Sequence, residues 1–202
     1  MRVVTVGASA VAAVVLSAVL GFALLLAVLA GSAFDQAGAS GAADIDGLPA
    51  PAPSADSETG CVRDDPTTRG CLTPTTLHVL ESIYATFGEP GGIIRSATCW
   101  DPHLQNPTSD HPKGRACDLF PTRAGVFPTG DELAHGWQLA NWLRANAGPL
   151  QIKYLIWQGR YWDPGTTDRD GAWGVPYTGG GIYDPTDATG GHFDHVHVSV
   201  AR

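Results

Sequence analysis

Two short stretches of this 202-residue chain combine residue types that could bind a metal ion and activate water. The first covers residues 109–118, and the second, residues 192–197, holds three histidines within six residues. In a β-strand, residues two apart share a face, so two histidines at that spacing can point to one site. Neutral imidazole and carboxylate are standard zinc ligands, and three protein ligands leave a fourth position for water. The pattern predicts a zinc site built from His111, Asp118 and one of the final histidines, His195 or His197.

Both stretches resemble the zinc D-alanyl-D-alanine peptidases, including those of vancomycin resistance. The L-alanyl-D-glutamate endopeptidases and the Hedgehog N-terminal domain share that fold. The second motif is matched in its acid-x-x-His form by Asp194 and His197, and in its His-x-His form by His195 and His197. The resemblance spans residues 93–200. The first motif, Ser-x-His-x-x-Gly-x-Ala-x-Asp, is matched at every fixed position: Ser109, His111, Gly114, Ala116 and Asp118.

The resemblance assigns a role to each of these residues. It implies that Asp194 is the general base and that Arg95 stabilises developing negative charge. A carboxylate near the attacking water can take its proton and return it to the leaving amine. In an ideal strand Asp194 would face away from His197, so the strand must begin or bend near His195; otherwise His195 is the better candidate for the base or oxyanion partner. By the resemblance, zinc is held by His111, Asp118 and His197.

The resemblance implies a zinc peptidase that hydrolyses peptidoglycan stem peptides, as a D-Ala-D-Ala carboxypeptidase or a related endopeptidase. These two activities differ in what closes the substrate groove, which we expect to be the loop over residues 164–191. The alternative is a catalytically inactive cell-wall or metal-binding module of the same fold, as the Hedgehog comparison implies. The presence of Asp194 and Arg95 beside three ligands favours the enzyme.

The elements that must position these residues lie in residues 61–202, for which we expect one α+β domain with a small, mainly antiparallel sheet and flanking helices. Apolar residues at helical spacing predict a helix over 73–87, ended by Gly88. A second helix is predicted over 131–147, with Asp131 at its start and Gly148-Pro149 at its end. Strands are predicted over 92–98, 115–120, 152–157, 160–162 and 193–200, with a hairpin joining the third and fourth.

All four cysteines lie in the same domain, and they are most simply two disulfides. Three pairings are possible. We expect Cys61–Cys71 to close a short loop at the start of the domain and Cys99–Cys117 to join the two strands that flank residues 101–114. A zinc–cysteine site is the rival, but the chain has no Cys-x-x-Cys pair.

The chain begins with a segment, residues 3–34, that carries no charged side chain. A secretory signal has an apolar core of about 7–15 residues and a spanning helix needs about 20, so the length favours a retained transmembrane anchor. A cleaved signal is the alternative, because Gly31-Ser32-Ala33 offers small residues for a peptidase. Arg2 favours a cytoplasmic N-terminus, so the domain is expected on the extracytoplasmic side. Residues 35–60, rich in Ala, Pro and Gly, carry five acids and no base and predict a flexible linker.

The formal net charge of −8 and the lack of any basic run argue against nucleic acid as a partner, because phosphate binding needs clustered Lys and Arg. The expected partners are a peptidoglycan peptide and, through the first segment, a membrane. We expect the protein to be a monomer.

Overall fold

A six-stranded antiparallel sheet is the centre of the computed structural model, which describes residues 44–55, 58–168 and 172–201. Its strand order is β3-β4-β8-β5-β6-β7. The strands are β3 (Ser96–Thr98), β4 (Ala116–Phe120), β5 (Ile152–Trp157), β6 (Arg160–Trp162), β7 (Val175–Pro176) and β8 (Val196–Val200). A separate ladder pairs β1 (Arg63–Asp64) with β2 (Cys71–Leu72).

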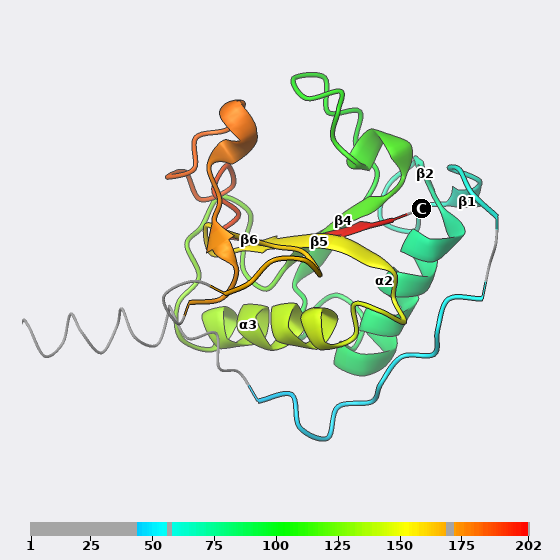
Figure 1. The fold of residues 1–202 in the computed structure, drawn as a ribbon, viewed down its shortest axis with the longest axis horizontal. Helices are drawn as coiled ribbons and strands as arrows, with labels where there is room; N and C mark the ends of the chain where they lie inside the picture. Colours follow the sequence, from blue (N-terminus) through cyan, green and yellow to red (C-terminus); the bar gives the residue numbers. More distant parts are fainter. Residues whose placement is uncertain (1–43, 56–57, 169–171, 202) are drawn as a thin grey trace, which may run out of the picture. The chain divides into compact units, whose positions relative to one another are not determined.

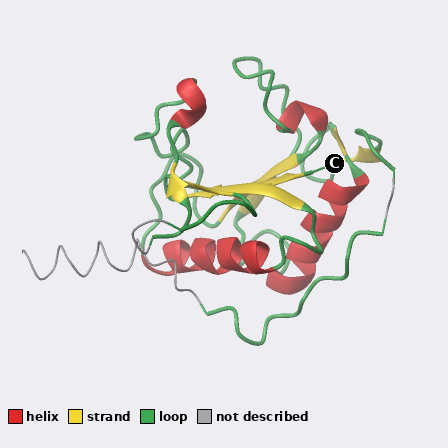
Figure 2. Cartoon of the chain, in the orientation of Figure 1, coloured by secondary structure: helices red, strands yellow, loops and turns green. Residues whose placement is uncertain are grey.

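Two helices, α2 (Pro74–Phe87) and α3 (Gly130–Ala145), lie on one side of this sheet (Figures 1 and 2). The Thr73 side chain caps α2 by accepting a hydrogen bond from the Thr76 backbone N–H. At the other end, the Gly88 N–H donates to the Tyr84 carbonyl. Both helices were predicted to within two residues at each end, which confirms a mixed α and β fold with antiparallel sheets.

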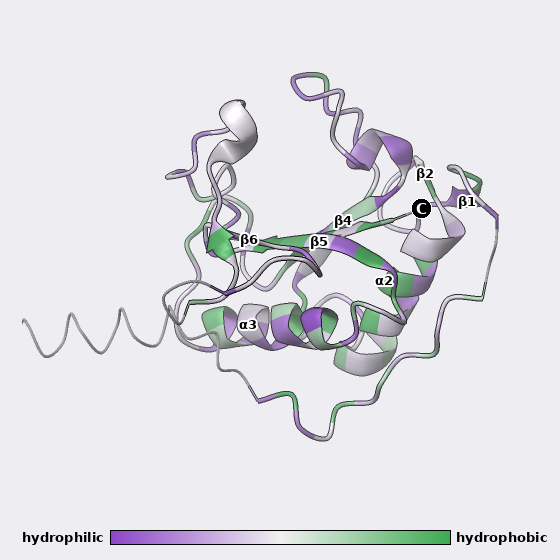
Figure 3. Ribbon diagram, in the orientation of Figure 1, coloured by the Kyte–Doolittle hydropathy of each residue, from purple (hydrophilic) through white to green (hydrophobic). Residues whose placement is uncertain are grey.

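The alternation of residues in β8 separates the core from the opposite face of the sheet. Val196, Val198 and Val200 are buried in the hydrophobic core, whereas His197 and Ser199 alternate with them and therefore face the other way. Figure 3 shows hydrophobic residues along the central strands and hydrophilic residues around the short helix η1 (His111–Lys113). The sheet thus has a helix-covered apolar face and a polar face.

Two long segments, residues 101–114 and 163–191, rise from the polar face (Figure 1). The first ends in η1, and the second contains β7 and a further short helix, η2 (Gly179–Gly181). Residues 164–191 were predicted to be a loop, and in their described part, residues 164–168 and 172–191, β7 and η2 are short exceptions. Between them these segments form the two walls of a cavity whose floor is the sheet.

Two predicted strands begin later than expected. The predicted strand over 92–98 starts only at Ser96. The final strand starts at Val196 instead of residue 193, because the N–H groups of Phe193 and Asp194 both donate to the Ala188 carbonyl and are not in the ladder. Phe193 and Asp194 therefore belong to the loop that precedes β8 and not to the sheet.

Both predicted disulfides are present, Cys61–Cys71 and Cys99–Cys117. The second joins the residue that follows β3 to the second residue of β4. The described part of the chain therefore contains no free cysteine.

Residues 44–55, which belong to the predicted flexible linker over residues 35–60, pack against the domain. Ile45 and Leu48 pack against the hydrophobic core, and the Trp142 indole N–H donates to the Pro49 carbonyl at 3.0 Å. Further contacts join the Asp44 carbonyl to Gln138, the Ala52 carbonyl to His78 and the Ser54 N–H to the Pro149 carbonyl. The predicted membrane segment, residues 1–34, lies outside the described residues. Within the described ranges, no helix has the length and apolar character to cross a membrane.

Candidate metal centre

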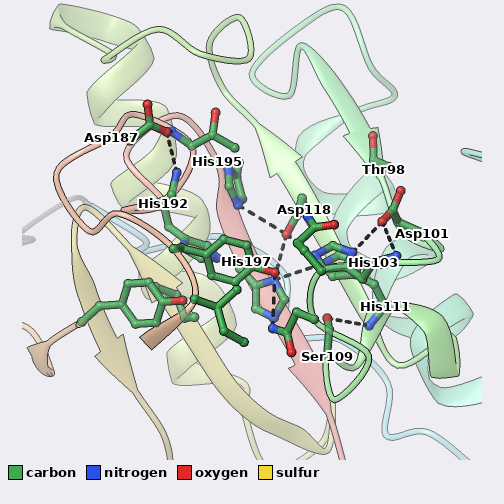
Figure 4. A pocket seen from close by; sticks show the side chains of 18 of the residues that line it. Thr98, Asp101, His103, Ser109, His111, Asp118, Asp187, His192, His195 and His197 are labelled. Atoms are coloured by element: carbon green, nitrogen blue, oxygen red, sulfur yellow. Dashed lines mark hydrogen bonds and ion pairs between the residues drawn. The ribbon is translucent and has the colours of Figure 1, made fainter. Parts of the chain in front are cut away.

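Three of the predicted ligands meet on the polar face of the sheet. Asp118 and His197 are direct cross-strand partners on β4 and β8, with Asp118 Oδ1 2.8 Å from His197 Nδ1. His111 Nε2, from η1, lies 3.3 Å from each of these atoms. One ligand atom from each residue lies within 4.8 Å of the other two, so the group could hold a metal ion (Figure 4).

The local sequence explains how His111 reaches this position. The Ser109 hydroxyl accepts a hydrogen bond from the His111 N–H at 3.3 Å. Gly114 ends η1 with φ 65°, and a Cβ there would lie 2.5 Å from the Cys71 carbonyl oxygen, so only glycine fits. The His111 Nδ1 bonds to the Cys99 carbonyl, which directs Nε2 toward the other ligands.

A chain of hydrogen bonds from His197 through Ser199 to Asp110 orients the His197 imidazole. When Nδ1 binds a metal, Nε2 carries the proton and donates it to Ser199 Oγ, 3.2 Å away. Ser199 Oγ in turn donates to Asp110 Oδ2 at 3.1 Å. Asp110 is buried and is paired with Lys153 at 2.7 Å and Lys113 at 3.3 Å. Such outer partners fix the orientation of a ligating imidazole.

The closeness of these groups shifts their pKa values. Burial alone would lower the pKa of His111, but the Asp118 carboxylate outweighs it and raises the pKa to about 9. Burial likewise works against ionisation of Asp118, yet His111 and His195 hold its pKa well below the usual value. A cation would therefore take the place of a proton in this cluster.

Asp194 is fully buried and does not line the cavity. Its Oδ2 accepts hydrogen bonds from the Gly125 N–H at 2.6 Å and from the Thr189 hydroxyl at 2.7 Å, and its Oδ1 lies 2.5 Å from His195 Nδ1. The expectation that Asp194 reaches the metal ligands is not met. The strand begins directly after His195, as that role required, but the bonds from Gly125 and Thr189 hold the carboxylate outside the cavity.

His195 occupies the place expected for Asp194. Its ring lines the cavity, and its Nε2 lies 3.5 Å from Asp118 Oδ1. Burial lowers its pKa, but the charges of Asp118 and Asp194 raise it by more. Asp194 is thus an orienting partner for His195.

Residues 68–189 match the family of the VldE C-terminal domain, a span of more than half the chain. The chain belongs to this family. The part matched to the VldE domain includes His111 and Asp118 and ends before His195 and His197. Comparison with curated proteins and with solved structures finds no match.

Arg95 lies away from the metal cluster. Its guanidinium lies 3.8 Å from the Glu132 carboxylate on α3, and its side chain is 53% exposed. It lines a separate hollow of about 400 Å³ with Asp131 and His135. The prediction that Arg95 stands beside the ligands is therefore wrong: it precedes β3, and its N–H donates to the Phe120 carbonyl while its side chain turns to α3.

The cavity has a volume of about 600 Å³ and aromatic walls. The His103 ring stacks on His111 with centroids 4.8 Å apart, and Tyr154 stacks on His197 at 5.3 Å. Sequence reasoning assigned no role to His103 or Tyr154. Tyr154 could have been found from β5, where it shares a face with Ile156, the cross-strand partner of His197.

Proposed function

We propose that this protein is a zinc-dependent hydrolase that cleaves peptide bonds in peptidoglycan stem peptides at the cell envelope. The observation that carries the proposal is the His111–Asp118–His197 cluster with the Asp194–His195 pair beside it in one cavity. Neutral histidines and a carboxylate are the ligands of catalytic zinc sites, which keep one position open.

The roles follow from the geometry of the side chains. A zinc ion held by the three ligands would polarise the substrate carbonyl and lower the pKa of a water molecule. His195 Nδ1 donates to Asp194, so the Nε2 lone pair faces the ligands and can take the proton of the attacking water. The same nitrogen returns this proton to the amine as the C–N bond breaks, so one water is consumed and one acid and one amine are formed.

Asp194 supports this cycle without contact with substrate. Burial raises its pKa, but its hydrogen bond and ion pair with His195 lower it by more, so the carboxylate stays ionised. An ionised partner holds the imidazole in one tautomer and stabilises its protonated form. His195 is therefore the base in this proposal, and Asp194 its positioning residue.

The substrate and the location rest on the sequence resemblance to zinc D-Ala-D-Ala peptidases of the Hedgehog fold. Two disulfides agree with an extracytoplasmic, oxidising compartment. A membrane anchor over residues 1–34 would keep the domain near the cell wall. The alternative is a metal-binding module without hydrolysis, and the distance of Arg95 from the cavity is the observation that favours it.

The test compares the full chain with three histidine variants. The wild type should bind about one zinc per chain and release fragments from stem peptides, as measured by mass spectrometry. His197→Ala should lose zinc binding and turnover, whereas His195→Ala should keep zinc and lose turnover by about 10²–10⁴-fold. His135→Ala, which removes a histidine from α3 outside the cavity, is the matched control. Bound zinc with no turnover on any stem peptide would favour the module, and full activity of His195→Ala would contradict its role.

A further inference from the structure

The rim of the metal cavity is acidic on both walls. Asp101 belongs to one wall, and Asp184 and Asp187 belong to the other; Figure 4 shows Asp101 and Asp187 on opposite sides of the metal cluster. None of the described residues that line the cavity is a lysine or an arginine. Four lining carboxylates are described, Asp118 included, so even a divalent cation leaves their formal charge at −2.

Three cationic side chains that do not line the cavity are paired with other residues. Lys113 donates to the Thr108 carbonyl and pairs with Asp110, and Lys153 pairs with the other oxygen of Asp110. Arg95 pairs with Glu132 in a separate hollow. In the described part of the chain, the cavity therefore offers no side-chain cation to a carboxylate of the substrate.

Asp184 and Asp187 are exposed, and their carboxylates can accept further hydrogen bonds. Asp184 Oδ1 accepts from the N–H and hydroxyl of Thr186, and Asp187 Oδ1 accepts from the N–H groups of Thr189 and Gly190. The described residues make no hydrogen bond to Oδ2 of either residue. These bonds hold both carboxylates in place at the cavity with one oxygen left to a ligand.

A second feature of the cavity also points to a ligand. The His192 side chain is buried, with only 9% of the residue exposed, and lines the cavity. Its Nδ1 has no hydrogen-bond partner among the described residues. Its ring is packed edge-on against Tyr177, with centroids 4.9 Å apart. A buried polar atom without a partner is rare, and a bound peptide would supply one.

We propose that this cavity binds a peptide that carries a free ammonium group close to the scissile bond, and that it cleaves within a peptide chain instead of before a C-terminal carboxylate. The inference rests on the proposed hydrolase function and narrows its substrate. Asp184 and Asp187 would receive the ammonium group, and the faces of Tyr177 and Tyr183 on the same wall suit a cation. A terminal carboxylate would meet like charges and, among the described residues that line the cavity, no lysine or arginine.

The ammonium group can be a diamino-acid side chain or a free N-terminus, and the test separates the two. Binding is measured by calorimetry on the zinc-loaded full chain carrying His195→Ala, which prevents turnover. The probes are a lysine-containing stem pentapeptide, its Nε-acetyl-lysine form, its N-terminally acetylated form and its C-terminal amide. Acetylation of the recognised amine should weaken binding about fivefold or more, the loss expected for one or two exposed charge pairs. The C-terminal amide should bind at least as well as the acid.

Two asparagine variants test whether Asp184 and Asp187 cause the preference for a free amine. Asp184→Asn and Asp187→Asn keep the oxygen that caps the loop but remove the charge, so each should reduce the preference for the free amine. Asp64→Asn removes an exposed charge on β1, outside the cavity, and should leave the preference unchanged. Equal binding of free and acetylated peptides, tighter binding of the acid than of the amide, or no binding of any probe would overturn the inference. Turnover by the wild-type chain is scored separately and tests the hydrolase proposal alone.

Discussion

The Asp118 carboxylate and the His197 imidazole face each other across β4 and β8, with Oδ1 2.8 Å from Nδ1. Directly opposed residues in an antiparallel pair have Cβ atoms about 5 Å apart, so the register of the ladder alone brings these two ligands together. A slip of β8 by one residue would turn His197 into the core and place a valine at the site. The metal centre therefore depends on the same register that buries Val196 and Val198.

Replacement of Ser199 by alanine should weaken zinc binding about 10–100-fold, the usual effect of losing an outer partner of a ligand. Ser199 Oγ connects His197 Nε2 to Asp110, and without it the imidazole can rotate or adopt the other tautomer. Competition for zinc with a chromogenic chelator measures the change. Ser96→Ala, at an exposed position on β3, is the control. Unchanged affinity in Ser199→Ala would contradict the role of this hydrogen-bond chain.

The two disulfides should differ in their effect on metal binding. Removal of Cys99–Cys117 by a double alanine replacement should lower the free energy of unfolding by about 3 kcal/mol, as for a loop of similar length. It should also reduce zinc affinity, because the Cys99 carbonyl orients His111 and Cys117 precedes a ligand in β4. Removal of Cys61–Cys71 should lower stability with a smaller effect on affinity. Denaturant unfolding and zinc titration of both variants make the comparison, and equal losses of affinity would refute it.

Asp65 should make stability depend on pH in the acid range. Its carboxylate accepts hydrogen bonds from Thr67, Thr68 and the Trp100 N–H. Burial raises its pKa, but these bonds together lower it below the usual value. The stabilisation is therefore present above the unfolded pKa of about 3.9 and is lost as the pH falls through the lower folded pKa.

Asp65→Asn should consequently lower the free energy of unfolding by about 1–2 kcal/mol at pH 7. The difference from wild type should narrow below about pH 4. Thermal unfolding followed by circular dichroism at several pH values measures this, with Asp64→Asn as the exposed control. A difference that stays constant down to pH 3 would show that the charge of Asp65 contributes nothing.

Local signals were enough to predict most of the elements. The α2 helix is set by its own apolar spacing and by Thr73 and Gly88 at its ends, which all lie within the segment. The start of β8 is different, because it depends on the Ala188 carbonyl, which binds two N–H groups that would otherwise extend the strand. The amino-acid pattern of residues 193–200 does not predict this contact, because Ala188 lies outside that segment.

The same distinction applies to the site. The three ligands belong to motifs whose spacing is fixed by the fold, and they meet as predicted. Asp194 and Arg95 each lie just before a strand, and the point where the strand begins determines where the side chain goes. Residues beside a strand end were therefore the ones whose positions were predicted wrongly.

The segment over residues 44–55 shows how composition can mislead, and it gives the last prediction. Its Ala and Pro content indicates a linker, but Leu48 packs against the core and the Pro49 carbonyl accepts the Trp142 indole N–H. Leu48→Asp should lower the free energy of unfolding by about 1–2 kcal/mol through lost apolar burial. Ala50→Asp introduces the same charge two residues away at an exposed position and should have little effect. Chemical denaturation of both variants tests this, and equal stabilities would mean that the segment is a tether after all.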